Sequence, residues 1–217
     1  MIKANIWDFY AGWYEKLWVQ KFVLKPSRRL ILKTLETLPS TENILDVGCG
    51  IGELCREMSS QFRNSFIVGM DPSSKMIERA RKESVSGQID YHNGFLNTLN
   101  HGQQFDVIVS THAFPYMPDK REVLTQLSSK MKPDGRLLLL CANRNNLYDA
   151  IWLALVKLTT STAEYPSVSS IHQMMREAGY KIGRTQRITS QRFVPSVYMV
   201  EGILSEIRGN NSQTIIS

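Results

Sequence analysis

An aspartate and three glycines form the part of the sequence best suited to bind a ligand. Gly48, Gly50 and Gly52 stand at alternate positions directly after a short apolar run that contains Asp46. Glycine accepts the positive φ angles of a sharp turn and lets a ligand approach the main chain more closely than a Cβ would allow. Residues 52–61 have a helical pattern, so the N-terminal amides of that helix would face a ligand over the turn. The pattern predicts a binding site between a buried strand and a helix.

The glycine spacing separates two classes of ligand. A dinucleotide fingerprint reads G-x-G-x-x-G, and its third glycine would fall where this chain has Glu53. The spacing therefore argues against a pyrophosphate and disfavours a dinucleotide oxidoreductase. Asp46 offers instead a carboxylate that suits a ligand with an amine and no phosphate. A tight turn in some other α/β protein is the structural alternative.

Residues 44–54 resemble the first motif of class I S-adenosylmethionine-dependent methyltransferases, which commonly reads (hydrophobic)-L-D-(hydrophobic)-G-C-G-x-G. Similar features follow in the family's order, including D-V-I-V-S at residues 106–110 and K-P-D-G at residues 132–135. The resemblance implies a seven-stranded, mostly parallel, doubly wound α/β sheet with an antiparallel final strand and flanking helices. It also implies the cofactor S-adenosyl-L-methionine, the product S-adenosyl-L-homocysteine and no metal.

The cofactor candidates gather after the predicted strands. Asp71 follows a buried strand at residues 65–70, where a carboxylate can accept hydrogen bonds from both ribose hydroxyls. An Asx or N-cap role before the helix at residues 74–84 is the structural alternative for Asp71. Pro72 and Met76 would border the adenine, although Met76 equally suits plain helix packing. The complete set of cofactor-binding candidates is Tyr10, Tyr14, Asp46, Gly48, Cys49, Gly50, Gly52, Asp71, Pro72, Met76, Asn93, Gly94, Phe95, Ser110 and Thr111.

The sequence departs from the family after a third predicted strand at residues 89–92. Many family members have an aspartate after the glycine here, and its carboxylate accepts the adenine amino group. This chain has Asn93, Gly94 and Phe95. Phe95 would cover the adenine ring, Asn93 would supply a polar partner, or backbone groups would hold the adenine alone.

A candidate general base follows the fourth predicted strand, at residues 104–110. The segment after this strand lies over the ligand in α/β sheets of this kind. In the family, backbone carbonyls near the strand end hold the methionine amine, which places Ser110, Thr111 and His112 beside the reacting methyl group. His112 is the candidate base because an imidazole titrates near neutral pH. Packing or ordinary hydrogen bonding is the alternative role for His112.

The most aromatic segment lies near the N-terminus. Tyr10, Trp13 and Tyr14 recur at helical spacing and would line one face of a helix. Many of these methyltransferases begin with a similar pattern whose tyrosines close the site. Residues 1–38 are therefore expected to form lid helices, with Tyr14 as a candidate catalytic residue and Ser27 as the cap of a helix running to about residue 38. Packing on the domain surface and contact with a membrane interface are the alternatives.

The rest of the chain is expected to complete a single domain, residues 1–217. The insertion at residues 143–166 contains an amphipathic stretch and is expected to shape the acceptor pocket, with a helix covering the core as the alternative. Ser169 or Ser170 would cap a helix that continues through Ala178. The remaining predicted elements are a helix at 120–131, a central apolar strand at 137–141, and an antiparallel hairpin of strands at 180–189 and 193–204.

The composition is that of an ordinary globular domain. The 217 residues are 42% hydrophobic and 21% charged, and the formal net charge is +6. The positive charge is dispersed along the chain, so no nucleic-acid partner is expected. The three cysteines lack C-x-x-C spacing, which favours buried thiols in a reducing compartment. The N-terminal segment resembles no secretory signal and no apolar span reaches about 18 residues, so a cytoplasmic location is expected.

The sequence predicts methyl transfer to a small or medium-sized, hydrophobic metabolite by a monomer or homodimer. An alternative acceptor is the amine of a phospholipid headgroup, reached through peripheral contact of the N-terminal helix with a membrane. Another hypothesis is a non-catalytic module that binds S-adenosylmethionine or S-adenosylhomocysteine. Phe95 suggests that module, and so do Pro115 and Tyr116, which stand where some family members have a histidine pair. The N/D-P-P-Y/F sequence is lacking, so amino nitrogens of nucleobases and glutamine are less expected acceptors.

Overall fold

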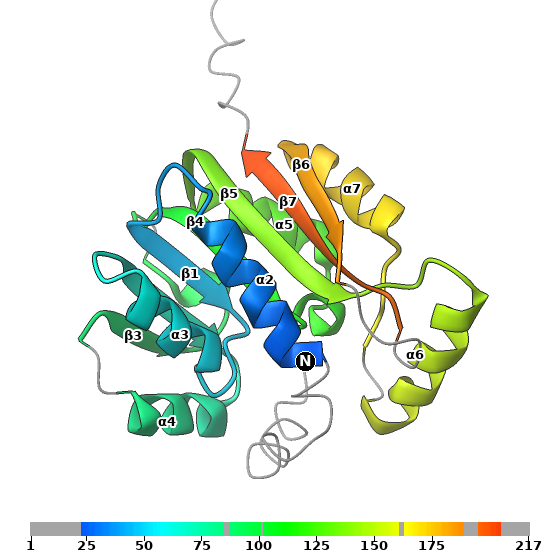
Figure 1. Cartoon of the computed structure of the whole chain (residues 1–217), viewed down its shortest axis with the longest axis horizontal. Helices are drawn as coiled ribbons and strands as arrows, with labels where there is room; N and C mark the ends of the chain where they lie inside the picture. Colours follow the sequence, from blue (N-terminus) through cyan, green and yellow to red (C-terminus); the bar gives the residue numbers. More distant parts are fainter. Residues whose placement is uncertain (1–22, 85–86, 101, 161–162, 189–194, 205–217) are drawn as a thin grey trace, which may run out of the picture.

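Seven strands form one sheet in the order β3-β2-β1-β4-β5-β7-β6. The structure is a computed structural model that describes residues 23–84, 87–100, 102–160, 163–188 and 195–204 (Figure 1). The predicted α/β fold, with a mostly parallel sheet and flanking helices, is confirmed. The strands are β1 (Asn43–Val47), β2 (Phe66–Asp71), β3 (Ile89–Asn93), β4 (Phe105–Thr111), β5 (Met131–Ala142), β6 (Tyr180–Arg187) and β7 (Val197–Leu204).

The pairing of the strands sets one functional edge of the sheet. β1 pairs in parallel with both β2 and β4, and β4 pairs in parallel with β5. β7 is antiparallel to both of its neighbours, β5 and β6, which confirms the predicted closing hairpin. The carboxyl ends of β1, β2 and β4 therefore meet at the same edge, where open α/β sheets bind their ligands.

Helices cover both faces of the sheet (Figure 1). One apolar layer joins the sheet to α2 (Lys25–Leu35), α3 (Glu53–Gln61) and α4 (Ser74–Glu83). The other joins it to α5 (Lys120–Ser129), α7 (Val168–Glu177) and the short 3₁₀ helix η3 (Leu96–Thr98). Burial on both faces explains the continuously apolar stretch 137–141 in β5, whose side chains are all 0% exposed.

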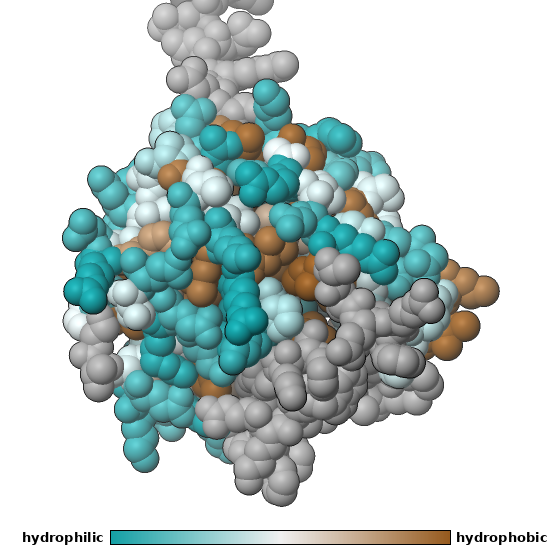
Figure 2. All heavy atoms as spheres, viewed as in Figure 1, coloured by the Kyte–Doolittle hydropathy of each residue, from teal (hydrophilic) through white to brown (hydrophobic). Residues whose placement is uncertain are grey.

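Helix α6 (Leu147–Thr160) projects from the edge of this body (Figure 1). Leu147, Tyr148 and Ile151 on this helix are 78%, 45% and 56% exposed. Figure 2 shows apolar side chains gathered at the outer end of α6, at the right of the view. The helix predicted within the insertion is present, and part of its apolar surface lies outside the core.

Two predicted helix caps need correction. Ser27 does not cap α2, because the helix already begins at Lys25 and Ser27 lies inside its first turn. Ser167, and not Ser169 or Ser170, caps α7 by accepting a hydrogen bond from the Ser170 amide. At α7 three nearby serines offer similar caps, whereas the N-cap position of α2 is Leu24, which has no side-chain cap.

The strand β5 is longer than predicted. Met131 already pairs with Phe105 of β4, before a shift of register leads to the pairing of Arg136 with Val107. Residues 132–135, which carry the K-P-D-G sequence, thus form an irregularity within β5, with Asp134 at a φ of 59°. At the other end of the chain β6 stops at Arg187, two residues before the predicted end.

The predicted lid falls largely outside the described residues. Tyr10, Trp13 and Tyr14 belong to residues 1–22, so the lid hypothesis stays a prediction. Within the described part of the chain, no helix is long and apolar enough to cross a membrane.

Gly48→Ala is expected to cost more stability than Gly50→Ala. Both glycines have positive φ, 79° and 54°, so each alanine pays about 1–2 kcal/mol for a left-handed backbone. A Cβ on Gly48 would lie 2.2 Å from the Ala113 Cβ, whereas a Cβ on Gly50 would meet nothing within 4 Å. Overpacking should therefore add roughly 1–3 kcal/mol to the Gly48 variant alone, measured by urea unfolding. Ala113→Gly should recover that added loss, and equal effects of the two alanines would contradict the argument.

Candidate functional site

The turn between β1 and α3 has the backbone that its glycines predict. Gly48, Gly50 and Gly52 have φ angles of 79°, 54° and 78°. The amides of Gly48 and Cys49 both donate to the Met70 carbonyl of β2, at 2.8 and 3.0 Å. Gly52 is the left-handed N-cap residue of α3 and has no side chain to offer as a cap. The amide end of α3 therefore faces the carboxyl edge of the sheet, as expected.

Asp71 braces this glycine turn from the end of β2. Its Oδ2 accepts a hydrogen bond from the Gly50 amide at 3.0 Å, and its Oδ1 accepts one from the Ser73 amide at 2.9 Å. Ser73 is the residue that caps α4, through its hydroxyl and the Met76 amide at 3.2 Å. Asp71 thus makes the turn contact proposed as its structural alternative. These two bonds fix the orientation of the carboxylate at the end of β2.

Asp46 is a buried carboxylate with too few partners. Its residue is 1% exposed, and its Oδ2 accepts one weak hydrogen bond from the Cys55 thiol at 3.4 Å. Its Oδ1 has no hydrogen-bond partner within the described part of the chain. Burial raises the pKa of Asp46 to about 7, the Cys55 hydrogen bond opposes that rise and the nearby Asp71 charge adds to it. The structure therefore holds an acceptor that a cationic donor would satisfy.

His112 follows β4 in a left-handed conformation, with a φ of 60°. Its amide donates to the Leu140 carbonyl at 2.6 Å, which fixes the residue against β5. Its Nε2 lies 2.8 Å from the Ser27 hydroxyl of α2, and that hydroxyl lies 2.7 Å from the Val23 carbonyl. Burial lowers the pKa of His112 to about 4, so the imidazole is neutral at physiological pH.

The two contacts of Ser27 decide which ring nitrogen of His112 carries the proton. A serine hydroxyl has a single hydrogen, and a carbonyl oxygen can only accept. Ser27 must therefore donate to the Val23 carbonyl and accept from His112, because the reverse would leave two oxygens 2.7 Å apart without a hydrogen between them. His112 is consequently the Nε2–H tautomer, and its Nδ1 keeps the lone pair.

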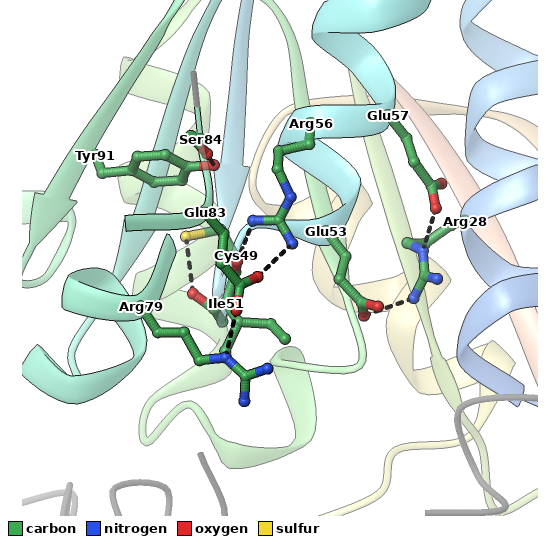
Figure 3. Close-up of polar contacts among 11 residues, drawn as sticks. Arg28, Cys49, Ile51, Glu53, Arg56, Glu57, Arg79, Glu83, Ser84 and Tyr91 are labelled. Carbon is green, nitrogen blue, oxygen red and sulfur yellow. Dashed lines mark hydrogen bonds and ion pairs between the residues drawn. The ribbon is translucent and has the colours of Figure 1, made fainter. Parts of the chain in front are cut away.

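A charged network around the glycine turn was not found from the sequence (Figure 3). Arg28 of α2 bridges two carboxylates of α3, Glu53 at 2.9 Å and Glu57 at 3.0 Å. Arg56 of α3 donates to the Ile51 carbonyl within the turn at 2.7 Å and pairs with Glu83 of α4 at 3.0 Å. The sequence offered one indication of this network, Glu53, which stands where a dinucleotide motif would have glycine. That Arg28 would be the ion-pair partner of Glu53 could not be deduced.

Tyr91 of β3 also supports the turn and was not predicted to do so. A Cβ on Gly52 would lie 2.3 Å from the Tyr91 hydroxyl oxygen, and one on Gly69 would lie 2.7 Å from the Tyr91 ring. The hydroxyl bonds with Ser84 at 3.0 Å, and burial raises the pKa of Tyr91. The ring fills the space that these two glycines leave open.

The other candidates near β1 and β4 are placed as follows. Cys49 is buried, with its thiol 3.7 Å from the Gly50 carbonyl. Ser110 is fully buried and its hydroxyl donates to the Val47 carbonyl at 3.0 Å, which ties β4 to β1. Thr111 is half-buried. Within the described residues, no three His, Cys, Asp or Glu side chains form a group that could hold a metal ion.

The candidates near β2 and β3 lie around Asp71. Asn93 donates its side-chain amide to the Asp71 carbonyl at 3.0 Å, and the Gly94 amide donates to the same carbonyl at 3.1 Å. Phe95 is 49% exposed, whereas Met76 is 2% exposed and packs in the core. Pro72 is half-buried.

One hollow at the carboxyl edge brings part of the predicted set together. Asp71, Pro72, Met76 and residues 93–95 do not line this hollow, although Asp71 contacts the turn that does. Its lining is Leu24, Arg28, Asp46, Gly48, Cys49, Gly50, Ile51, Glu53, Leu54, Thr111 and His112.

The sheet order, the glycine turn and the strand-end carboxylates define a class I S-adenosylmethionine-dependent methyltransferase. The sequence model of a family described as a methyltransferase domain matches residues 19–184, and the chain belongs to this family. It is accordingly an S-adenosylmethionine-dependent enzyme.

Relatives and solved structures agree with this assignment. The chain is 26% identical to the demethylmenaquinone methyltransferase of Thermotoga maritima over 201 residues, covering 81% of each chain. It is 26% identical to a ubiquinone biosynthesis O-methyltransferase of Rhodopseudomonas palustris over 128 residues, which is 57% of this chain and 50% of that protein. The magnesium protoporphyrin IX methyltransferase of Synechocystis, solved with bound S-adenosylhomocysteine, superposes with a TM-score of 0.71 over 94% of this chain and 100% of that chain, at 18% identity.

Asp46→Asn is expected to stabilise the protein at pH 7.5, whereas Asp106→Asn should destabilise it. The pKa of Asp46 is raised, so the native state keeps a proton that the unfolded state has lost, and stability falls as the pH rises from about 4 to 7. The loss amounts to roughly 4 kcal/mol at most, since a tenfold change in proton affinity is worth about 1.4 kcal/mol. The pKa of Asp106 is lowered by its bonds to Lys132, Ser40 and Asn43, so its contribution is present above the unfolded pKa.

Urea unfolding of both variants at pH 5 and 7.5 tests this pair. The advantage of Asp46→Asn over the wild type should grow with pH. A pH-independent effect, or a destabilised Asp46→Asn protein at pH 7.5, would show that Asp46 is ionised and satisfied in the native state.

Ser27→Ala is expected to change the tautomer of His112. Two-dimensional ¹⁵N NMR of the imidazoles should show the Nε2–H form in the wild type and a mixture of both neutral forms in the variant. Ser27→Thr should restore the first form. Thr34→Ala is the matched control, because Thr34 makes the same bond to a carbonyl four residues back on α2, at 2.9 Å. His112→Gln assigns the signal, and an Nδ1–H form in the wild type would refute the deduction.

Proposed function

We propose that this enzyme transfers a methyl group from S-adenosylmethionine to a small or medium-sized, hydrophobic metabolite. The observation that supports the cofactor site best is the buried Asp46 Oδ1, which has no hydrogen-bond partner among the described residues. The amino-acid part of S-adenosylmethionine carries an ammonium group, which supplies both a positive charge and hydrogen-bond donors. The residues present therefore fit the cofactor that the family uses.

The glycine turn and Asp46 would hold the methionine part together. Asp46 has its raised pKa because burial disfavours the charged carboxylate, and an ammonium beside it would favour the ionised form. In a site closed from water such a charge-assisted bond is shorter and stronger than a neutral one. Binding would then convert a carboxylic acid that lacks hydrogen-bond partners into a carboxylate paired with the ammonium, which gives selectivity for a ligand with an amine.

Asp71 would accept the ribose hydroxyls at the end of β2. The bonds from the Gly50 and Ser73 amides orient the carboxylate. Because the same carboxylate braces the turn, ribose recognition and turn geometry depend on one residue. Asn93 fixes the end of β3 against Asp71, and the exposed Phe95 ring is available to cover the adenine.

His112 would hold the proton of the acceptor through Nδ1. The bound cofactor supplies a sulfonium methyl group that is already a strong donor, so orientation and exclusion of water can provide most of the acceleration. A pKa near 4 makes His112 a weak base that stays unprotonated throughout the physiological range. This suits an acceptor whose proton is acidic or leaves late, such as an enol or phenol.

The names of the relatives support the choice of acceptor. They act on demethylmenaquinone or in ubiquinone biosynthesis, and a structural neighbour acts on magnesium protoporphyrin IX. The exposed Leu147, Tyr148 and Ile151 of α6 also favour an apolar acceptor over a polar one. The insertion at residues 143–166, which carries α6, is proposed to shape the acceptor pocket.

Binding of S-adenosylmethionine near pH 7 is expected to release about half a proton from Asp46, because that carboxyl is half protonated before binding. Titration calorimetry in phosphate and in Tris measures the release, since the two buffers differ in ionisation enthalpy. The proton release from Asp46 is the number of protons released by the wild type minus the number released by Asp46→Asn. The affinity of this variant for S-adenosylmethionine should fall about 10- to 100-fold.

The control ligand is 5′-methylthioadenosine, which keeps the adenosine and lacks the ammonium. It should bind both proteins equally and release no proton from Asp46. Equal proton release by wild type and variant would exclude Asp46 as the partner of the ammonium. Failure of S-adenosylmethionine to bind either protein would refute the cofactor site itself.

A further inference from the structure

A second hollow, distinct from the one beside the glycine turn, lies between α5, α7 and the end of the insertion. It has a volume of about 470 Å³ and is lined in part by Lys120, Arg121, Arg144, Glu164, Tyr165 and Met174. Small-molecule sites in proteins commonly measure about 300–1,000 Å³. The hollow is thus large enough for a metabolite or a substantial part of one.

The hollow opens at the same edge of the sheet as the glycine turn. Arg144 follows the carboxyl end of β5, and Lys120 begins α5 after the segment that leaves β4. Ala113 in that segment lies against Gly48, and the Pro115 carbonyl accepts a hydrogen bond from the Glu164 amide at 2.8 Å. The segment after β4 therefore has the glycine turn on one side and the wall of the hollow on the other.

The three cations of this hollow differ in their partners, and Arg144 alone has no carboxylate partner among the described residues. The Lys120 side chain is 10% exposed, and its Nζ donates to the Met117 carbonyl at 3.2 Å and lies 3.5 Å from a carboxylate oxygen of Glu164. Glu164 is itself 77% exposed, so its charge is well screened. Arg144 is exposed, and its guanidinium forms no hydrogen bond or ion pair with any residue that the structure describes. Arg121 is paired with Glu177.

An anion in the hollow would supply the hydrogen-bond acceptors that these cations lack. The nearly buried Lys120 ammonium carries three hydrogens, and its acceptors are the Met117 carbonyl and, at 3.5 Å, the Glu164 carboxylate, with the Phe114 ring centroid 6.0 Å away. A third acceptor can therefore approach it. Arg144 offers a planar fork of donors that matches a carboxylate or a phosphate. Tyr165 and Met174 add apolar surface to the same hollow. Cationic side chains beside an apolar wall favour an amphipathic acid over an inorganic anion.

We propose that this hollow binds the carboxylate or phosphate of the methyl acceptor, so that the acceptor is an amphipathic acid. The proposal rests on the proposed function, because it names the class of molecule that the same enzyme methylates. Lys120 and Arg144 hold the anion, and the apolar part of the acceptor reaches along the segment after β4 toward the glycine turn.

Three matched probes test the proposal with the full-length protein: 2-naphthoate, 2-naphthyl phosphate and the neutral 2-naphthamide. They share one ring system and differ in the group attached to it. Titration calorimetry should show one of the two anions binding at least about tenfold more tightly than the amide, the effect of a charge-assisted bond. The tighter of the two identifies the group as a carboxylate or a phosphate.

The variant Arg144→Gln should weaken anion binding about tenfold and leave binding of the amide unchanged. Because Arg144 is exposed, the substitution should not affect folding. Unfolding curves of the variant and the wild type check this. Arg63→Gln is the matched control, since Arg63 is also exposed but precedes β2 at the opposite edge of the sheet. Equal binding of all three probes, or anion binding that Arg144→Gln does not weaken, would overturn the proposal.

Binding of S-adenosylmethionine, measured in the same proteins, separates this inference from the proposed function. Arg144→Gln should bind S-adenosylmethionine as the wild type does, because Arg144 does not line the hollow beside the glycine turn. Loss of cofactor binding by the wild type would refute the proposed function. Intact cofactor binding without a preference for the anionic probes would refute the anion site alone.

Discussion

The burial of Asp46 inside a parallel sheet is the constraint on which the site depends. β1 lies between β2 and β4, with helices over both faces, so Asp46 on it is only 1% exposed although it lines the hollow. Asp106, on the neighbouring strand β4, shows how a structural aspartate is accommodated. It accepts hydrogen bonds from Ser40, Asn43 and Lys132 at 2.8–2.9 Å. Among the described residues Asp46 has only the Cys55 thiol as a hydrogen-bond donor, so its other oxygen could accept from a ligand.

The free-energy cost of burying the unsatisfied Asp46 oxygen explains why many contacts hold the surrounding turn. Asp71 and Met70 of β2 hold the amides of the turn, and Tyr91 of β3 fills the space beneath it. Arg56 adds a bond to the Ile51 carbonyl. A binding site that stores an unfavourable carboxylate must keep its main chain in one conformation, because a mobile turn would let water reach the charge and remove the selectivity.

The elements were predictable from the sequence because their signals are local. Within about ten residues, apolar runs, glycines or caps indicate each of these elements: the glycine turn, the seven strands and the helix after Asp71. The contacts between elements were not predictable. Ser27 and His112 are 85 residues apart, and Arg28 and Glu53 are 25 apart. Each of these residues also has an ordinary local role, such as a cap or a solvated charge, and nothing in one sequence separates that role from a long-range contact.

Helix α2 gains a functional meaning only through those long-range contacts. Two successive residues on it contact different elements beside the hollow: Ser27 sets the tautomer of His112 after β4, and Arg28 binds Glu53 and Glu57 of α3. The helix therefore connects the segment after β4 to α3. A small shift of α2 would alter both contacts at once, because side chains one residue apart on a helix move as one body.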